Sequence, residues 1–438
     1  MPGLIGPDEV RRVAEAALDV DADGVEVLFM HEWGGLSRFA DSSIHQSTWR
    51  EDTSVRVRVV SKGRVGVAST NDFSVEGAKR VADNAREMSQ IASPDPMFPG
   101  LAPKAPLSQR ERAFDEATST TSPEERAERI ADLVAQCDPG FHAAGALDTT
   151  AAEIALINSE GQFCYSPYTS AMVTTVVSGG DGGAGYSESW APSYGELDVE
   201  AIGKRAAEKA RDSQQPRDLD PGHYEVVLEP AAVGTLVAFL AYMGFGGRGL
   251  LEGRSCFSGR EGQQVGSEAV TIVDDALSPD TIGIPFDFEG TPKQRVEIIE
   301  NGVFRNAVYD RRSAKQAGIE STGHALPPPN PEGPFPLNVI FEPGQASFEE
   351  MIGSVQRGLL VTRFHYSNIV HPKEAVITGM TRDGTWLVED GQIKYPVKNF
   401  RFTQSILDAL KETAFVGRDT EMVSEFFFSA SRVPGLKV

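Results

Sequence analysis

Short runs of alternating apolar and polar residues fill residues 24–70 of the chain. Runs such as VEVLFM, TSVRVRVV and GRVGVAST are separated by Gly, Asp or Ser. A period of two residues is typical of a strand with one buried face, and the interruptions are typical of turns. We therefore expect an antiparallel meander over residues 24–70.

Helical spacing of apolar residues appears on both sides of this meander and again later. The clearest case begins at Ser122, where SPEE supplies an N-cap, a proline at the first helical position and a capping-box glutamate. A proline-rich stretch, residues 93–106, can continue neither a helix nor a strand and predicts a surface connection. The helices expected in this half span residues 8–18, 74–91, 122–137 and 199–213.

A break in the pattern divides the chain near residue 220, where QQPRDLDPGH has the composition of a linker. After it, HYEVVLEP predicts a strand, AAVGTLVAFLAYM predicts an apolar helix over residues 231–243, and the rest is mostly strands. Asn301-Gly302 and Asp390-Gly391 have the residue types of type I′ hairpin turns. We predict an α+β protein with two domains, an antiparallel sheet with helices (residues 1–220) and a β-rich C-terminal domain (residues 221–438).

The charge balance and the cysteine content limit the functions open to this chain. Its 438 residues include 41 Lys and Arg against 63 Asp and Glu, a formal net charge of −22, whereas binding to phosphate backbones requires clustered basic residues. Cys137, Cys164 and Cys256 form no CxxC pair, which suits a reducing cytoplasm. The N-terminus lacks a signal-peptide pattern, and the longest apolar stretch is about half of the roughly 20 residues that cross a bilayer. We expect a cytoplasmic protein with no nucleic-acid or membrane partner.

None of the common catalytic motifs is present in the sequence. The GFGGRG of residues 244–249 matches a dinucleotide fingerprint but follows a helical pattern, so we interpret it as a helix exit. No HExxH and no GxSxG occur. Three acidic pairs could bind a cation or act as acid and base: Asp274-Asp275, Asp287 with Glu289, and Glu349-Glu350. Their neighbours, such as Pro285, Gly290 and Pro292, more naturally predict turns. Seven histidines are scattered along the chain: His31, His45, His142, His223, His324, His365 and His371.

Several longer phrases resemble one protein family. They are RFADSSIHQ (38–46), VTIVDD (270–275), DFEGTPKQRVEIIENGV (287–303), STGHA (321–325), GLLVT (358–362) and TGMTRDGTWLVEDGQIKYPVKNFRF (378–402). In these phrases the chain resembles the TldD/PmbA family, also called TldD/TldE or modulators of DNA gyrase. The resemblance implies a cytoplasmic two-component peptidase in which a zinc-bearing TldD-type subunit pairs with a TldE-type (PmbA) subunit.

The zinc motif of that family is missing from this chain. TldD-type subunits carry HExxxH on a helix, with a cysteine near the C-terminus as a further ligand. Aligning the Gly-x-Leu-Leu before that helix with Gly234-Thr-Leu-Val237 puts Ala238, Phe239 and Met243 at the motif positions, and none of these side chains can ligate zinc as required or act as a general base. No histidine lies between residues 223 and 324, and the C-terminal tail has no cysteine. The resemblance therefore implies the metal-free subunit, without catalytic or metal-binding residues, and places zinc in a TldD-like partner.

A metal-free subunit of this kind would form one side of a cleft that holds unfolded or short peptides. An extended peptide can bind at a strand edge. We expect the groove to involve Arg363, Thr378 and Arg382, where Arg382 could pair with a substrate carboxylate. The alternative for Arg382-Asp383-Gly384 is a hairpin turn with a local ion pair. The partner would be a TldD-like subunit in a heterodimer, or a second copy of this chain.

Two other functions stay open on the sequence. The chain could be a metallopeptidase on its own, with ligands drawn from His324, His365 and His371, if a bend of the sheet brought the last two together. It could also be a protein-binding modulator of a DNA-processing enzyme, as the older description of the family suggests.

Overall fold

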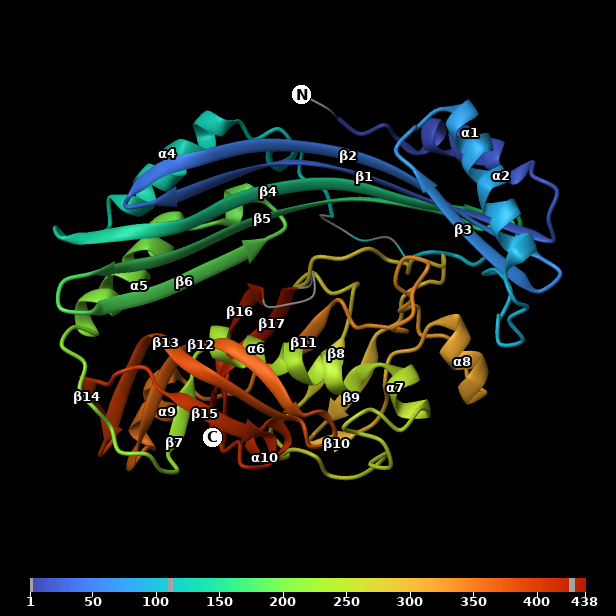
Figure 1. Ribbon diagram of the computed structural model, residues 1–438. Helices are drawn as coiled ribbons and strands as arrows, with labels where there is room; N and C mark the ends of the chain where they lie inside the picture. Colours follow the sequence, from blue (N-terminus) through green and yellow to red (C-terminus); the bar gives the residue numbers. More distant parts are fainter. Residues whose placement is uncertain (1–2, 109, 111–112, 425–429) are drawn as a thin grey trace.

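A long, curved antiparallel sheet lies across a C-terminal unit that is built on a second sheet (Figure 1). The computed structural model describes residues 3–108, 110, 113–424 and 430–438. Both sheets are combined with helices, so the predicted α+β class is confirmed. No helix within these ranges is long and apolar enough to cross a membrane.

The first sheet has six strands in the order β3-β2-β1-β4-β5-β6, and neighbouring strands are antiparallel. Its first three strands form the predicted meander, which is confirmed. Asp41 and Ser42, with φ angles of 51° and 57°, make the left-handed turn between β1 and β2. The strands are β1 (Gly24–Ala40), β2 (Ser43–Ser61), β3 (Arg64–Thr70), β4 (Phe141–Asn158), β5 (Phe163–Gly179) and β6 (Gly183–Ala191).

Helices pack against this sheet in pairs. The pair α1 and α2 buries small and branched side chains against one half of the sheet, in a core that includes Phe29 and Val57. The pair α4 and α5 covers the other half around Leu133 and Val173. The capping box predicted at Ser122 is present at the start of α4. The predicted helices are confirmed as α1 (Pro7–Leu18), α2 (Val75–Ile91), α4 (Pro123–Val134) and α5 (Val199–Asp212), with α3 (Glu116–Ser119) and η1 (Tyr194–Glu196) between them.

A buried carboxylate fixes the start of the chain to this sheet. Glu153 on β4 is fully buried, and its oxygens accept hydrogen bonds from the backbone N–H groups of Ile5 (2.6 Å) and Gly6 (3.0 Å). His31 Nδ1 lies 3.0 Å from the same carboxylate, and the Tyr165 hydroxyl donates to it at 2.7 Å. Burial acts to raise the pKa of Glu153, but these hydrogen bonds outweigh burial and hold the pKa below its ordinary value.

Glu153→Gln should lower the free energy of unfolding by about 2 kcal/mol near neutral pH, because an amide offers one acceptor oxygen where the carboxylate offers two. The folded-state pKa of Glu153 lies below the unfolded value of about 4.3, so its stabilising contribution exists above that pH and is lost as the pH falls through the folded pKa. Urea titrations at about pH 7 and about pH 3.5 should therefore show a deficit that shrinks in acid. The exposed Glu160→Gln serves as the control, and a deficit that does not change with pH would contradict this role of Glu153.

The second sheet has eleven strands along the path β10-β9-β8-β11-β17-β7-β12-β13-β14, with β15 paired to β13 and β16 paired to β17. The helix α6 (Pro230–Leu240) packs on β12, β16 and β17, and continues as the π-helical turn η2 (Ala241–Phe245). Both residues of Asn301-Gly302 and of Asp390-Gly391 have positive φ angles, so the predicted type I′ turns are confirmed.

The remaining elements belong to this C-terminal unit. The strands are β7 (Glu225–Leu228), β8 (Ile272–Asp274), β9 (Val296–Glu300), β10 (Val303–Phe304), β11 (Val339–Phe341), β12 (Arg357–His371), β13 (Val376–Glu389), β14 (Gln392–Pro396), β15 (Arg401–Ser405), β16 (Phe415–Ser424) and β17 (Ala430–Lys437). The helices are α7 (Gly247–Leu251), α8 (Arg311–Ala317), α9 (Phe348–Gly353), η3 (Pro372–Glu374) and α10 (Ile406–Lys411).

Candidate functional site

The helix α6 is the element to which the resemblance assigns the zinc motif. It starts directly after β7 with Pro230 in its first turn, and nearly every residue along it is buried. Phe239 and Met243 are each 6% exposed and pack in the core of the C-terminal unit, while Ala238 is half-buried. Hydrocarbon side chains and a thioether in this core do not fit a zinc ion, which takes nitrogen, oxygen or thiolate ligands. No catalytic step of this chain is therefore assigned to a metal on α6.

The histidines considered as other ligands do not meet. His365 and His371 both lie on β12, where they are paired with Met380 and Val376 of β13. These two partners are four residues apart along one strand, a separation of about 13 Å, so the bend considered as an alternative, which would bring the two histidines together, is not present. His324 lies apart from them in a buried cluster. In the part of the chain that the structure describes, no group of three or more His, Cys, Asp or Glu side chains is close enough to hold a metal ion.

A cavity of about 370 Å³ lies between the two units, at the start of α6. One wall comes from β6 and α5, and the other comes from α6, α9 and the β16–β17 pair. Lys209 forms an ion pair with Glu229 and Arg205 forms one with Glu421, and both pairs join the first unit to the second. The volume is within the range of small-ligand pockets, roughly 300 to 1,000 Å³.

Two of the three predicted groove residues lie side by side near this cavity. Arg363 on β12 and Arg382 on β13 are cross-strand neighbours, and the carboxylate of Asp383 is an ion-pair partner of both. The guanidinium of Arg363 also stacks on the ring of Tyr186, 4.0 Å from its centroid, and Tyr186 lines the cavity. Arg363 is therefore part of the contact between β12 and β6.

The third predicted groove residue, Thr378, lies farther along β13 and does not join this pair. Its hydroxyl donates to the backbone carbonyl of Phe402 at 2.8 Å. The hairpin turn considered at residues 382–384 is wrong, because β13 continues through them and its register with β12 shifts there. Asp383 and Gly384 have φ angles of 53° and 123° and form a bulge. The considered ion pair is present, with Arg382 Nε 3.7 Å from Asp383 Oδ1.

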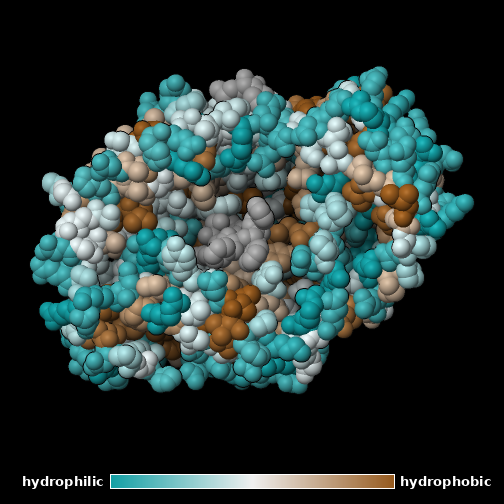
Figure 2. Space-filling model, in the orientation of Figure 1, coloured by the Kyte–Doolittle hydropathy of each residue, from teal (hydrophilic) through white to brown (hydrophobic). Residues whose placement is uncertain are grey.

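A larger cavity of about 960 Å³ opens within the C-terminal unit. Its lining is mainly apolar and includes Phe364 and Phe402, whose ring centroids are 4.4 Å apart. Arg401, an exposed basic residue, is one of the residues that line this cavity. The predicted groove residues are not among the described residues that line it. On the face in Figure 2, apolar residues gather in separate patches within a largely hydrophilic surface.

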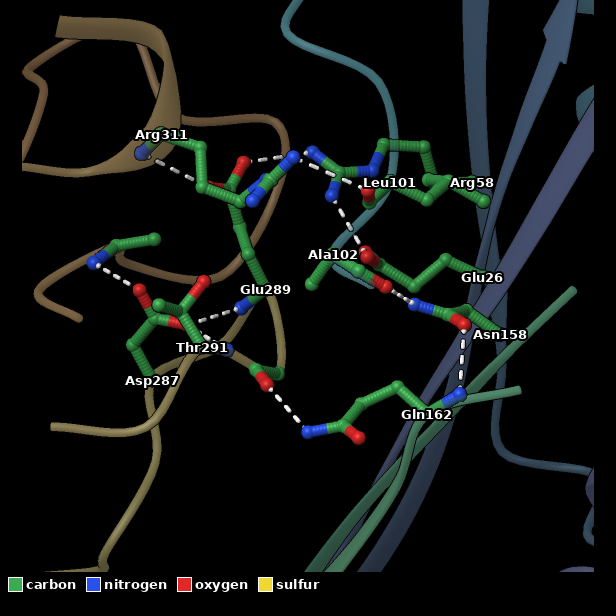
Figure 3. A network of polar contacts seen from close by, with 12 residues as sticks. Glu26, Arg58, Leu101, Ala102, Asn158, Gln162, Asp287, Glu289, Thr291 and Arg311 are labelled. Atoms are coloured by element: carbon green, nitrogen blue, oxygen red, sulfur yellow. Dashed lines mark hydrogen bonds and ion pairs between the residues drawn. The ribbon is translucent and has the colours of Figure 1, made fainter. Parts of the chain in front are cut away.

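A buried ion network joins the first sheet to the C-terminal unit. Figure 3 shows Arg58 of β2 between Glu26 of β1 and Glu289, which lies on the loop before β9. The guanidinium nitrogens are 2.8 Å from Glu26 and 3.0 Å from Glu289, and all three side chains are buried. The same loop accepts a hydrogen bond from Gln162 of the first unit at the carbonyl of Gly290 (2.9 Å). These contacts fix the orientation of the two units that border the cavity.

Asp287 shapes the loop that this network holds. Its carboxylate accepts hydrogen bonds from the backbone N–H groups of Glu289, Thr291 and Ala325, each at 2.9 Å. Burial, followed by the charge of Glu289, raises the pKa of Asp287 to about 7 against the effect of those donors. The turn expected around Asp287 is confirmed, but its carboxylate is fully buried, which the turn-forming neighbours did not indicate.

A second buried cluster gathers three of the phrases on which the resemblance rests. Asp274 of VTIVDD accepts hydrogen bonds from His324 of STGHA (2.8 Å) and from the backbone N–H of Asn338 (2.8 Å). Lys293 of the DFEGTPK phrase donates to the side chain of Asn338 at 3.1 Å. Burial lowers the pKa of His324 although Asp274 opposes it, so this imidazole is held neutral. The cluster lies inside the C-terminal unit and serves its packing.

Family models and known proteins match the chain along most of its length. The PmbA/TldA metallopeptidase domain 1 matches residues 25–89, the central domain matches 115–214 and the C-terminal domain matches 221–438. The Metalloprotease PmbA of Escherichia coli O157:H7 is 24% identical over 95% of this chain and 92% of its own length. A metalloprotease of Methanothermobacter thermautotrophicus is 25% identical over 83% of this chain and 81% of its own length.

Solved structures show the same fold. The crystal structure of TldE from Thermococcus kodakarensis has a TM-score of 0.87 at 21% identity and covers 98% of both chains. A protein of Thermotoga maritima, described as a candidate modulator of a DNA gyrase, has a TM-score of 0.86 at 21% identity, covering 98% of this chain and 97% of that chain. The resemblance read from the sequence phrases is thus confirmed, and the chain belongs to the PmbA/TldA (TldD/PmbA) metallopeptidase family.

Proposed function

We propose that this chain is the metal-free subunit of a TldD/TldE-type zinc metallopeptidase and that it acts in the cytoplasm with a zinc-bearing TldD-type subunit. The packing of α6 and η2 carries this proposal, because the positions that resemble the zinc motif hold Ala238, Phe239 and Met243, and the last two are core residues. The PmbA relative, named a metalloprotease, aligns along 95% of this chain and supports a role in such an enzyme. The unpaired state of the three cysteines suits the cytoplasm.

In this complex the chain contributes to the cleft that holds unfolded or short peptides. The cavity at the start of α6 supports this role, since β6 is the last strand of its sheet and its residues 186–188 line the cavity. An extended peptide can add to such a strand edge through backbone hydrogen bonds. The exposed guanidinium of Arg382 is close enough to the Arg363–Tyr186 contact to receive a peptide carboxylate.

The purified chain should contain no stoichiometric zinc and should not cleave unfolded peptides, because its positions that resemble the zinc motif hold neither the donors nor the general base that zinc hydrolysis requires. Mixed with a TldD-type subunit encoded by the same organism, it should form a complex with one zinc per pair and chelator-sensitive peptidase activity. Elemental analysis by mass spectrometry and cleavage of an unstructured reporter peptide measure both quantities.

Two outcomes would argue against the metal-free subunit. One is tightly bound zinc at one ion per chain in the isolated protein. The other is chelator-sensitive cleavage by the isolated chain that is lost in His365→Ala or His371→Ala. Association with a gyrase instead of a TldD-type subunit in a pull-down would favour the modulator function.

A further inference from the structure

The first part of β2 pairs with β1 on one side, and on its other side no strand among the described residues pairs with it. β2 pairs with β1 along its whole length, whereas β3 pairs only with Val55–Ser61. No other described strand pairs with residues 43–54, and residues 43–52 are all exposed. In Figure 1, β2 runs along the outer rim of the curved sheet.

This edge has few of the devices that normally prevent strands from associating. Such edges are usually short or carry charged side chains, above all lysine, or proline or bulges. Three charged residues, Arg50, Glu51 and Asp52, do lie on this edge, but Arg50 pairs with Glu32 and Asp148, and Asp52 accepts a hydrogen bond from Asn71, so these side chains are engaged within the first unit. The register with β1 slips at His45, but pairing is regular from Gln46 to Ser54, a stretch that we call the open edge, and it contains no Lys, Pro or Gly. Every second residue of an edge strand turns its N–H and C=O groups outward. The open edge is therefore a regular row of donors and acceptors that fits another strand.

The first part of β2, which includes the open edge, also exposes apolar surface on one face. Ile44 and Trp49 are 40% and 38% exposed. They are paired with Phe39 and Gly35, which are four residues apart on β1, so both side chains lie on the same face of the sheet. A strand added to this edge would cover part of both side chains. Aromatic residues of this kind are enriched in the centres of protein interfaces.

A chain with the same fold would bring a matching edge. The TldD homolog of Haemophilus influenzae is 22% identical to this chain over 402 residues, which is 87% of this chain. A TldD-type subunit is therefore related to this chain along most of its length and includes the region of the first sheet. Two such subunits can join equivalent edges antiparallel, which makes one continuous sheet about an approximate two-fold axis.

We propose that the open edge of β2 docks the equivalent strand of a TldD-type subunit. This rests on the function proposed above, which supplies the partner. The joined sheet would hold the two subunits in a fixed orientation through backbone hydrogen bonds, with Trp49 packed at the junction.

The test uses Thr48→Lys/Trp49→Lys, which places a lysine on each face of the open edge, with Met88→Lys/Ile91→Lys as the control. The control adds the same charge at exposed sites, 48% and 88% exposed, near the end of α2. Each variant of the full chain is mixed with the TldD-type subunit, and light scattering after size exclusion gives the dissociation constant. The edge variant should bind at least ~10-fold more weakly, since added lysines on an edge oppose strand pairing. The control should bind like wild type.

Hydrogen exchange identifies the occupant. Outward amides of residues 46–54 should exchange fast in the isolated chain and become protected in the complex. If the edge variant binds the TldD-type subunit as well as wild type does, the docking site is overturned and the proposed function stands. The isolated chain could instead show this protection already, because it forms a homodimer that the edge variant splits. That result would assign the open edge to a second copy of this chain and overturn the TldD-type partner. If wild type binds no TldD-type subunit at all, the proposed function fails and this assignment fails with it.

Discussion

Arg58→Met should lower the free energy of unfolding by about 3–5 kcal/mol near neutral pH, because removing one member of a buried ion network leaves the other charges uncompensated. Arg58 is the shared cation of Glu26 and Glu289, at 2.8 Å and 3.0 Å, and it is 7% exposed. Methionine keeps much of the apolar stem of the arginine, so the loss reports charge more than packing. Urea unfolding of wild type and variant measures the difference.

The deficit of Arg58→Met should depend on pH. Burial raises the pKa of Glu26 even in the wild type, where Arg58 opposes the rise. Without Arg58 the pKa rises further above the unfolded value of about 4.3, and the folded state then binds more protons than the unfolded state between those two values. The free energy of unfolding of the variant therefore falls as the pH rises through that window, and part of the stability should return at about pH 5. Adding Glu26→Gln to Arg58→Met should restore part of the lost free energy of unfolding at neutral pH.

Arg80→Met provides the matched control for Arg58→Met. Arg80 forms an ion pair with Asp72 at 2.7 Å on the surface, where both side chains are exposed. Such pairs contribute less than about 1 kcal/mol, so this variant should be nearly as stable as wild type. Equal losses for the two variants would contradict the role of Arg58 as the link between the two units.

Elements with local signals could be predicted from the sequence. The period of two in residues 24–70 indicated the meander, and the Ser122–Glu125 capping box indicated the start of α4. Caps and alternation act between residues that are close in the sequence, so one chain suffices to detect them. The absence of the HExxxH motif could also be read directly, because it depends on residue identity alone. The packing of Phe239 and Met243 adds that these positions are part of a core.

Features set by distant partners could not be predicted. Glu153 looked like an ordinary strand residue, but the backbone N–H groups that donate to its carboxylate belong to Ile5 and Gly6, which are far from it in the sequence. Asp287 and Glu289 had turn-forming neighbours, and only the approach of Arg58 from β2 reveals a buried network. The open edge depends in the same way on where β3 stops pairing with β2. Burial and strand pairing of this kind follow from the assembled fold, and sequence periodicity does not report them.

Asp274→Asn should also lower the free energy of unfolding by about 3–5 kcal/mol near neutral pH, because it removes one of the two buried carboxylates, Asp274 and Asp287, whose charges favour the charged form of the buried Lys293. Asp274 and Lys293 are 0% and 6% exposed. Each oxygen of Asp274 accepts a hydrogen bond at 2.8 Å, one from His324 and one from the N–H of Asn338, whereas asparagine turns an NH₂ group toward one of these donors. The neighbouring Asp275→Asn is the control, since Asp275 pairs with the exposed Arg295 at 3.3 Å and should cost less than about 1 kcal/mol.

The pH dependence of Asp274→Asn should run opposite to that of Arg58→Met. Burial lowers the pKa of Lys293, and Asp274 opposes this fall in the wild type. In the variant the pKa of Lys293 falls further below the unfolded value of about 10.4, so the unfolded state binds more protons between the two values and the free energy of unfolding rises with pH there. Stability measured between about pH 7 and about pH 10 should therefore recover for Asp274→Asn, as it does toward acid for Arg58→Met. The two deficits should therefore move in opposite directions with pH. If both moved in the same direction, the uncompensated charge could not be a lysine in Asp274→Asn and a carboxylate in Arg58→Met.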